Sequence, residues 1–313
     1  MTTFTPALAL ALGAAAAMVH SPDAQARQIG EPAGSGPYPA IAESPASAPG
    51  YTVYRPAELP AEPLPVVVWG NGGCRDNGLS ASHFLREIAS HGYLVIANGT
   101  AREERPPRQS LEPPPEPGTP PPPPPTRVAD ETSVAQYLGA IDWAQRANVD
   151  GGPLSGHVDP DRVAAMGHSC GGLQALAAGA DPRVDTVVAF ASGVYIRPRS
   201  GLSGVGIAKE DLARLHGPVA YVLGGPEDIA FPNGSDDFAQ IDHVPAMLAN
   251  LPVGHGGTFQ LVNGGDWARL GTAWLDWQLK GDRQAAKWFV GADCKLCTTF
   301  GWTVERKNFP EFP

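Results

Sequence analysis

The chain has 313 residues, 42% of them hydrophobic, and its formal net charge is −10. A chain of this length and composition can bury the core of one ordinary α/β domain. The acidic balance, with no cluster of Lys or Arg evident in the sequence, argues against a nucleic-acid or anionic-membrane surface. We therefore expect no nucleic-acid partner.

The N-terminus reads as a targeting segment. An apolar run at residues 7–19 precedes Ala-Gln-Ala at 24–26, which has the small-x-small form of a signal-peptidase site. This pattern predicts a signal peptide over 1–26 and a secreted or periplasmic protein. The run is too short to span a bilayer permanently, as is every later apolar stretch, so no stable membrane anchor is expected. Residues 27–50 are rich in Ala, Pro, Gly and Ser and predict a flexible leader before a single domain over 51–313.

The first predicted strands lead into a glycine-rich loop. Residues 51–55 alternate like a strand, and 66–69 are a continuous apolar run typical of a central parallel strand. The run ends in GNGGC at 70–74. Backbone N–H groups of such a loop can turn inward and bind a negative oxygen. We predict Gly73 as an oxyanion donor, with Cys74 as the alternative.

A helix at 79–90 and a buried strand at 93–97 follow. The segment 106–125 then holds twelve of the 34 prolines, six of them consecutive, and predicts a solvated polyproline II loop. We interpret it as a surface insertion, with an edge of the active site or a partner-binding segment as alternatives. A helix over about 130–148 returns the chain to the sheet.

The segment GHSCGG at 167–172 lies between an apolar run at 163–166 and a small-residue helical segment at 173–180. A strand, a sharp turn and a helix with serine at the turn form a nucleophile elbow. Glycines two residues to either side suit this turn because a side chain there would collide with the neighbouring strand or helix. We therefore predict Ser169 as a nucleophile and the N–H of Cys170 as an oxyanion donor.

A candidate acid follows a late strand. After a strand predicted at 184–190, the strand at 219–223 runs into Gly-Gly-Pro at 224–226, and Asp228 comes directly after this turn. An acid at the end of a late strand is well placed to orient a histidine. Glu227, Asp236 and Asp237 are alternatives.

A candidate base completes the set. Among eight histidines, His255 is flanked by glycines that let a loop carry its imidazole over the sheet edge. It also completes the chain order Ser, Asp, His. His243 is the alternative, and His168 is expected only to shape the turn at the serine. A last amphipathic helix is predicted at 273–280.

Four cysteines, an even number, fit an oxidising compartment. Cys294 and Cys297 form a C-x-x-C with no second pair or nearby histidine, so a local disulfide is preferred over a zinc site. Cys74 and Cys170 follow the candidate oxyanion loop and the candidate nucleophile, and either a bridge or two small buried thiols would fit there. No histidine pair has metal-binding spacing, and neither a metal nor a cofactor is expected.

Together these segments resemble an α/β-hydrolase, which implies a mostly parallel central sheet with helices on both faces. The resemblance covers about 51–280. More narrowly, IASHGYLVI at 88–96 together with GHSCGG is similar to a branch that includes chlorophyllases, platelet-activating-factor acetylhydrolases, dienelactone-hydrolase-like proteins and bacterial polyester hydrolases. It implies a triad of Ser169, Asp228 and His255, with Gly73 and Cys170 as oxyanion donors.

The expectation is a secreted serine esterase that hydrolyses a small-molecule or polymeric carboxylic ester through an acyl-enzyme. Trp69, Ile229 and Phe231 lie near predicted strand ends and could contact substrate or belong to the core. A polyester (cutinase or PET-type) hydrolase is one alternative, although the polyester hydrolases resembled carry an aromatic residue at the first oxyanion position, where this chain has glycine. The others are a peptide or amide hydrolase and a non-catalytic hydrolase-fold binding protein.

Overall fold

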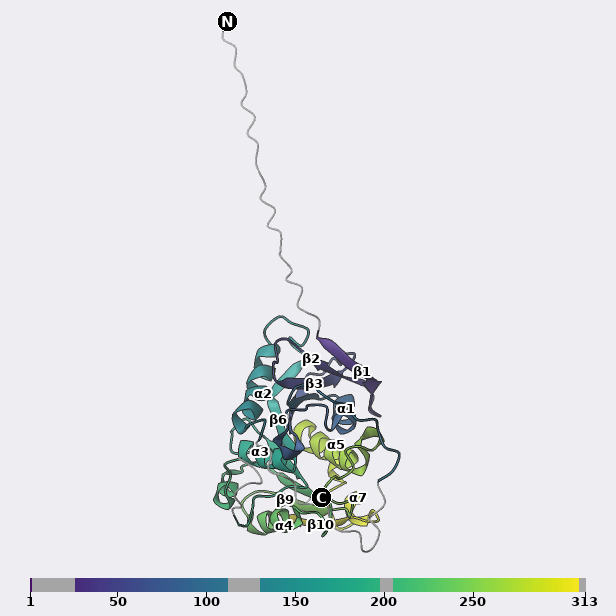
Figure 1. The fold of residues 1–313 in the computed structure, drawn as a ribbon, viewed down its shortest axis with the longest axis vertical. Helices are drawn as coiled ribbons and strands as arrows, with labels where there is room; N and C mark the ends of the chain where they lie inside the picture. Colours follow the sequence, from purple (N-terminus) through teal and green to yellow (C-terminus); the bar gives the residue numbers. More distant parts are fainter. Residues whose placement is uncertain (2–25, 112–129, 198–204, 310–313) are drawn as a thin grey trace.

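The computed structural model describes residue 1 and residues 26–111, 130–197 and 205–309. The predicted signal peptide, apart from residues 1 and 26, lies outside this part of the chain, as do residues 112–125 of the predicted proline-rich loop. The described residues form one mixed sheet of ten strands with helices packed against it (Figure 1).

The strand order is β1-β2-β3-β5-β4-β6-β7-β8-β9-β10. From β5 to β9 along this order the pairs are parallel, while β1, β2, β3 and β10 pair antiparallel at the two edges. The strands are β1 (Arg27–Ala33), β2 (Ala40–Ser44), β3 (Tyr51–Pro56), β4 (Leu64–Gly70), β5 (Leu94–Asn98), β6 (Val158–His168), β7 (Thr186–Phe190), β8 (Val219–Leu223), β9 (Ala246–Asn250) and β10 (Thr303–Lys307).

Helices cover both faces of the sheet. The α-helices are α1 (Ser82–Ser90), α2 (Val134–Ala147), α3 (Cys170–Ala178), α4 (Phe231–Gln240), α5 (Gly265–Lys280), α6 (Arg283–Ala286) and α7 (Lys295–Thr298), and the 3₁₀ turns are η1 (Gly72–Cys74), η2 (Lys209–Arg214) and η3 (Val262–Gly264). Buried side chains of α1 and α5 share one hydrophobic cluster, and those of α2, α3 and α4 share the other. Figure 1 shows α1 beside α5 and α2 beside α3.

The central strands are apolar along their whole length because both of their faces are covered. Every residue of β4, β5, β7 and β8 is buried. Successive side chains alternate between the faces, so Val67 and Trp69 belong to the α1 and α5 cluster while Val66 and Val68 belong to the other. This explains why the sequence predicted these strands well.

The predicted flexible leader over 27–50 contains two strands, which make up half of it. Residues 27–33 and 40–44 are β1 and β2, paired antiparallel to each other and to β3. Ala40 and Ala42 are fully buried and Ile41 is 5% exposed. Small alanines fill the core where α1 packs on this edge, so the strand lacks the β-branched composition that usually identifies one.

Candidate active site

Ser169 stands in a sharp turn between β6 and α3, with φ 53° and ψ −118°. A non-glycine residue in this region is strained, and it persists only where its surroundings hold it. A Cβ on Gly167 would lie 2.2 Å from the carbonyl oxygen of Gly171, and one on Gly171 would lie 2.0 Å from the carbonyl carbon of Gly70. The two glycines therefore allow the strand and helix to approach closely enough to form the turn.

The structure brings Ser169, His255 and Asp228 into one hydrogen-bonded chain. The Ser169 Oγ lies 3.0 Å from His255 Nε2, and His255 Nδ1 lies 2.6 Å from Asp228 Oδ1. A neutral imidazole with its proton on Nδ1 donates to Asp228 and accepts from the serine hydroxyl. The arrangement can move the serine proton onto the imidazole and hold the resulting positive charge beside a carboxylate.

Asp228 is held tightly as an anion. Its side chain is fully buried, and it accepts hydrogen bonds from the backbone N–H of Gly224 and of Ala230, each at 2.9 Å. Burial by itself would raise the pKa of this carboxyl, but the bonds from His255 and the two amides outweigh it and leave the pKa below its ordinary value. Asp228 therefore carries its charge where the imidazole needs it.

The alternative residues lie elsewhere. Asp237 Oδ2 accepts from the backbone N–H of Val194, and its other oxygen and Asp236 pair with Lys209. Glu227 is exposed. His243 Nε2 lies 2.9 Å from the carbonyl oxygen of Leu215. None of these four groups contacts Ser169 or His255 within the described residues.

His168 contributes more than the shape of the turn. Its Nε2 donates a 2.8 Å hydrogen bond to the backbone carbonyl of His255, so it anchors the loop that carries His255. Its Nδ1 side faces Gly72, where a Cβ would approach to 2.5 Å. Burial, and next the neighbouring His255, lower the pKa of His168 to about 4, which keeps the ring neutral at ordinary pH.

The candidate oxyanion loop is held by the side chain of Asn71. Its Oδ1 accepts from Trp69 Nε1 at 3.0 Å and from Ser80 Oγ at 2.9 Å, and its Nδ2 donates to the carbonyl of Asn98 at 2.6 Å. The N–H of Cys74 is occupied by the carbonyl of Asn71 at 3.1 Å, whereas within the described residues no acceptor is bonded to the N–H of Gly73. This favours Gly73 over Cys74 as a donor.

Both cysteine pairs are disulfides. Cys294–Cys297 confirms the predicted local bridge, and Cys74–Cys170 decides between the bridge and the two thiols that the sequence left open. The Cys74–Cys170 bridge joins the end of the candidate oxyanion loop to the residue after Ser169. The backbone N–H groups of Glu131 and Thr132 and the Thr132 hydroxyl all donate hydrogen bonds to the Cys74 carbonyl oxygen.

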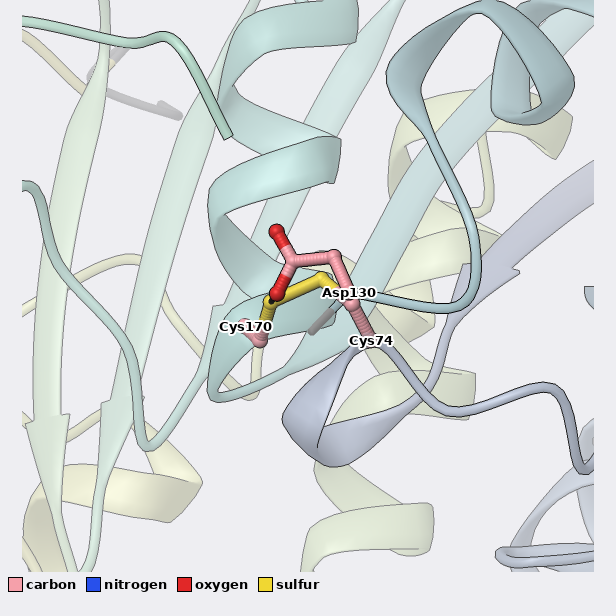
Figure 2. A group of neighbouring side chains, drawn as sticks. All are labelled: Cys74, Asp130 and Cys170. Atoms are coloured by element: carbon pink, nitrogen blue, oxygen red, sulfur yellow. Dashed lines mark hydrogen bonds between the residues drawn. A yellow bond between two sulfur atoms is a disulfide. The ribbon is translucent and has the colours of Figure 1, made fainter. Parts of the chain in front are cut away.

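One group of metal-ligand residue types gathers near this bridge. Asp130 Oδ1 lies 3.6 Å from Cys170 Sγ, with Cys74 adjacent (Figure 2). The two sulfur atoms are bonded to each other, so neither is available as a thiolate ligand. The group as it stands offers one carboxylate, which does not make a metal site.

A cavity of about 1110 Å³ opens beside His255 and His168. Its walls come from the turn after β4, from residues 102–111 and from residues 253–261. Two of these segments are tied together, since the N–H of Arg108 donates to the carbonyl of Gln260 at 2.7 Å and the N–H of Val262 donates to that of Arg108 at 3.1 Å. Residues 102–111, which include the first residues of the predicted proline-rich loop, thus form a wall of the cavity.

The three predicted substrate contacts are placed differently. Trp69 borders the cavity, although it is fully buried and packs against Phe84 and Phe259 in the core. Ile229 is 73% exposed and Phe231 packs against the core cluster on the α2 and α3 side; neither borders the cavity. The sequence indicated that these three residues lie near strand ends, but it could not show that the cavity lies away from Ile229 and Phe231.

Sequence reasoning missed four arginines that line this cavity, Arg75, Arg102, Arg105 and Arg108. Three of them, at 102, 105 and 108, recur every third residue around the start of the proline-rich segment, a signal that could have been noted.

The chain matches no protein-family model. A search of curated proteins likewise finds no significant match. Among the described residues, no helix is both long and apolar enough to cross a membrane.

Proposed function

We propose that this protein is a serine esterase of the α/β-hydrolase fold, from the branch that the sequence resembles, and that it hydrolyses carboxylic esters. The observation that carries the proposal is the hydrogen-bonded chain from Ser169 Oγ through His255 to Asp228 Oδ1, at 3.0 and 2.6 Å. The fold assignment draws support from the strained serine between β6 and α3 at the carboxyl end of a central parallel strand.

In this mechanism His255 accepts the proton of Ser169 as its Oγ attacks the ester carbonyl carbon. Asp228 stabilises the imidazolium that forms, and the imidazolium then protonates the departing alkoxide. The N–H groups of Gly73 and Cys170 would donate to the tetrahedral oxyanion, each contributing on the order of 3 kcal/mol in the transition state. Water activated by the same imidazole would attack the acyl-enzyme and release the acid.

Export belongs to the same proposal. Its supports are the apolar run before Ala-Gln-Ala at 24–26 and the two disulfides, which persist in an oxidising compartment. The site as a whole needs no metal or cofactor for the steps above.

Hydrolysis of p-nitrophenyl acetate and butyrate by the purified protein tests the esterase activity. Because the triad acts as a unit, Ser169→Ala should lower kcat by at least about 10³-fold. Asp228→Asn, which cannot hold the catalytic tautomer of His255, should lower it by about 10³- to 10⁴-fold. The matched control is Glu227→Gln, which removes the exposed carboxylate next in sequence and should retain the wild-type rate.

Equal rates for wild type and Ser169→Ala would reject the proposal. A fluorophosphonate probe separates the remaining alternative of a non-catalytic binding protein, because it reacts covalently only with an activated serine. We expect the wild type to be labelled at Ser169 and the Ser169→Ala variant to remain unlabelled.

A further inference from the structure

The cavity beside His255 carries charge of the opposite sign to the protein as a whole. Among the described residues that line it are four arginines and three carboxylates, with no lysine. The acids are Asp76, Glu103 and Glu131. The described part of the lining therefore has an excess of one positive charge (four arginines against three carboxylates), in a chain whose formal net charge is −10. Such a concave positive region favours an anionic ligand.

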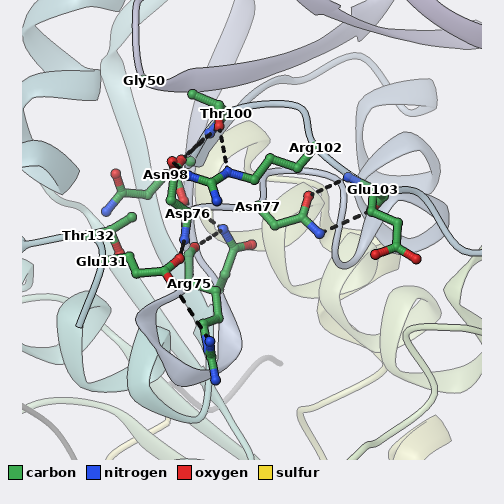
Figure 3. Close-up of polar contacts among 12 residues, drawn as sticks. Gly50, Arg75, Asp76, Asn77, Asn98, Thr100, Arg102, Glu103, Glu131 and Thr132 are labelled. Atoms are coloured by element: carbon green, nitrogen blue, oxygen red, sulfur yellow. Dashed lines mark hydrogen bonds and ion pairs between the residues drawn. The ribbon is translucent and has the colours of Figure 1, made fainter. Parts of the chain in front are cut away.

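Two of the three carboxylates are already engaged by the protein. Asp76 Oδ1 accepts from the N–H of Thr100 at 2.6 Å and from its Oγ1 at 3.0 Å, and its Oδ2 pairs with Arg102 (Figure 3). Glu131 Oε2 accepts from the N–H of Asp76 at 2.8 Å. These bonds hold both carboxylates in the cavity wall, where Asp76 is paired with Arg102 and Glu131 lies beside Arg75.

Arg75 lies beside Gly73 of the candidate oxyanion loop. A Cβ placed on Gly73 would be 3.2 Å from Arg75 Nε, so this side chain lies over the candidate oxyanion loop. Among the described residues its ion-pair partner is Glu131, whose Oε1 lies 3.7 Å from Nη1, beyond hydrogen-bonding distance. The Arg75 side chain is 47% exposed, and the residue lines the same cavity as His255. Its guanidinium retains donors that can point toward a ligand.

We infer that the site takes esters bearing a second, free carboxylate, such as half-esters of dicarboxylic acids, and that Arg75 binds this carboxylate. The inference rests on the proposed esterase function and adds its substrate class. The planar guanidinium matches a carboxylate with two parallel hydrogen bonds. An excess of one positive charge suits a monoanion better than a doubly charged phosphate monoester.

The test compares methyl butyrate with monomethyl succinate, in which a carboxylate replaces the terminal methyl group of the acyl chain. Acid release at constant pH gives kcat and KM for each ester. In Arg75→Gln the ratio of kcat/KM for the half-ester to that for the neutral ester should fall at least tenfold, mainly through KM. Arg75→Lys, which keeps the charge, should recover part of the ratio. Arg269→Gln removes an exposed arginine on α5 and should leave the ratio at its wild-type value.

A binding measurement separates this inference from the esterase proposal. Titration calorimetry of monomethyl succinate into Ser169→Ala should show binding that weakens as salt is added. In the double variant Ser169→Ala/Arg75→Gln the Kd should rise about tenfold. If Ser169→Ala hydrolyses esters at the wild-type rate, the esterase proposal fails while this titration still decides the role of Arg75. An unchanged kcat/KM ratio in Arg75→Gln, or equal Kd values with and without Arg75, would overturn the inference.

Discussion

His168 lies between the turn after β4 and the loop that carries His255, and the structure opposes its protonation. In the folded protein its pKa is about 4, against an ordinary value of 6.5. Between these two pH values the unfolded chain binds a proton that the folded chain does not. Folding stability therefore falls as pH drops from 6.5 toward 4, and His168 alone accounts for about 2 to 3 kcal/mol of that fall.

We predict that His168→Gln makes stability less dependent on pH. Glutamine keeps an N–H donor for the carbonyl of His255 but does not titrate. Urea denaturation at pH 7 and pH 4.5 measures the free energy of unfolding of each protein. The loss between the two pH values should be about 2 kcal/mol smaller in the variant, because all other titrating groups are common to both. Equal losses would show that His168 is protonated readily in the folded state.

Among individual residues, the sequence best predicted the positions where backbone geometry demands a particular residue type. The turn at Ser169 needs glycine at 167 and 171, and the structure shows the close backbone contacts that exclude a side chain there. The structure also places Asp228 and His255 within hydrogen-bonding distance of each other, as the chain order suggested, while their catalytic role stays a prediction. No such backbone requirement calls for arginine at position 75, and the position of the Arg75 side chain over Gly73 depends on how the loop folds.

The Cys74–Cys170 bridge joins two elements that the chain separates by 96 residues. It holds η1, with the candidate donor Gly73, against the start of α3. A cross-link over so long a loop removes much of the entropy of the unfolded chain, about 4 to 5 kcal/mol in the loop-closure model. The bridge thus stabilises both the fold and the separation of the two candidate oxyanion donors.

We predict that the double variant Cys74→Ala/Cys170→Ala loses about 4 kcal/mol of unfolding free energy and most of its esterase rate. The matched control, Cys294→Ala/Cys297→Ala, opens a bridge with a separation of 3 residues, for which the same model gives about 2 kcal/mol. This control bridge lies in the C-terminal segment, so its loss should leave kcat for p-nitrophenyl butyrate near the wild-type value. Denaturant titration and ester hydrolysis measure the two effects. An equal loss of activity in both variants would contradict the role assigned to the first bridge.

Strands and helices were predictable from the sequence where every residue is buried. They were not predictable where contacts with neighbouring segments determine the local structure. The strands β4, β5 and β8 read as apolar runs because both of their faces are covered. The edge strand β10, TVERK, is polar at four of its five positions because it pairs only with β9. Helix α4 contains Asn, Gly, Ser and two Asp, which are poor helix formers. It forms where Gly234 packs closely on the chain after β7, with a Cβ position 2.6 Å from the Ser192 carbonyl oxygen.

Across the whole molecule, the sequence predicted five of the parallel strands and β3, but it did not predict β1, β2, β9 or β10. The alternation of apolar strands with helical segments predicts a parallel sheet covered on both faces. The β1–β2 edge depends instead on contacts with distant residues. Arg55 makes two bonds to Glu43, at 2.9 and 3.0 Å, and Arg86 donates to the carbonyl of Ile29 at 2.7 Å. Arg86 and Ile29 are 57 residues apart, and the Arg55–Glu43 pair forms only when β2 and β3 lie side by side, so composition alone did not reveal these contacts.

The last prediction concerns this edge. A chain that begins at residue 51 should be less stable than one that begins at Arg27 by at least about 3 kcal/mol, because it loses the buried Ile41 and the partners of several buried charges. Among these is Glu87, 4% exposed, which would lose both the N–H donor and the hydroxyl donor of Ser35. Denaturant titration of the two chains measures the difference.

The shorter chain should also associate. Without β2, strand β3 becomes an edge with unpaired N–H and C=O groups beside a hydrophobic core, which is a template for pairing with a second copy. Light scattering at rising protein concentration should therefore show oligomers for residues 51–313 and far fewer for residues 27–313. If both chains unfold with the same free energy and stay equally monomeric, the β1–β2 hairpin is dispensable to the sheet, and the domain begins at residue 51 after all.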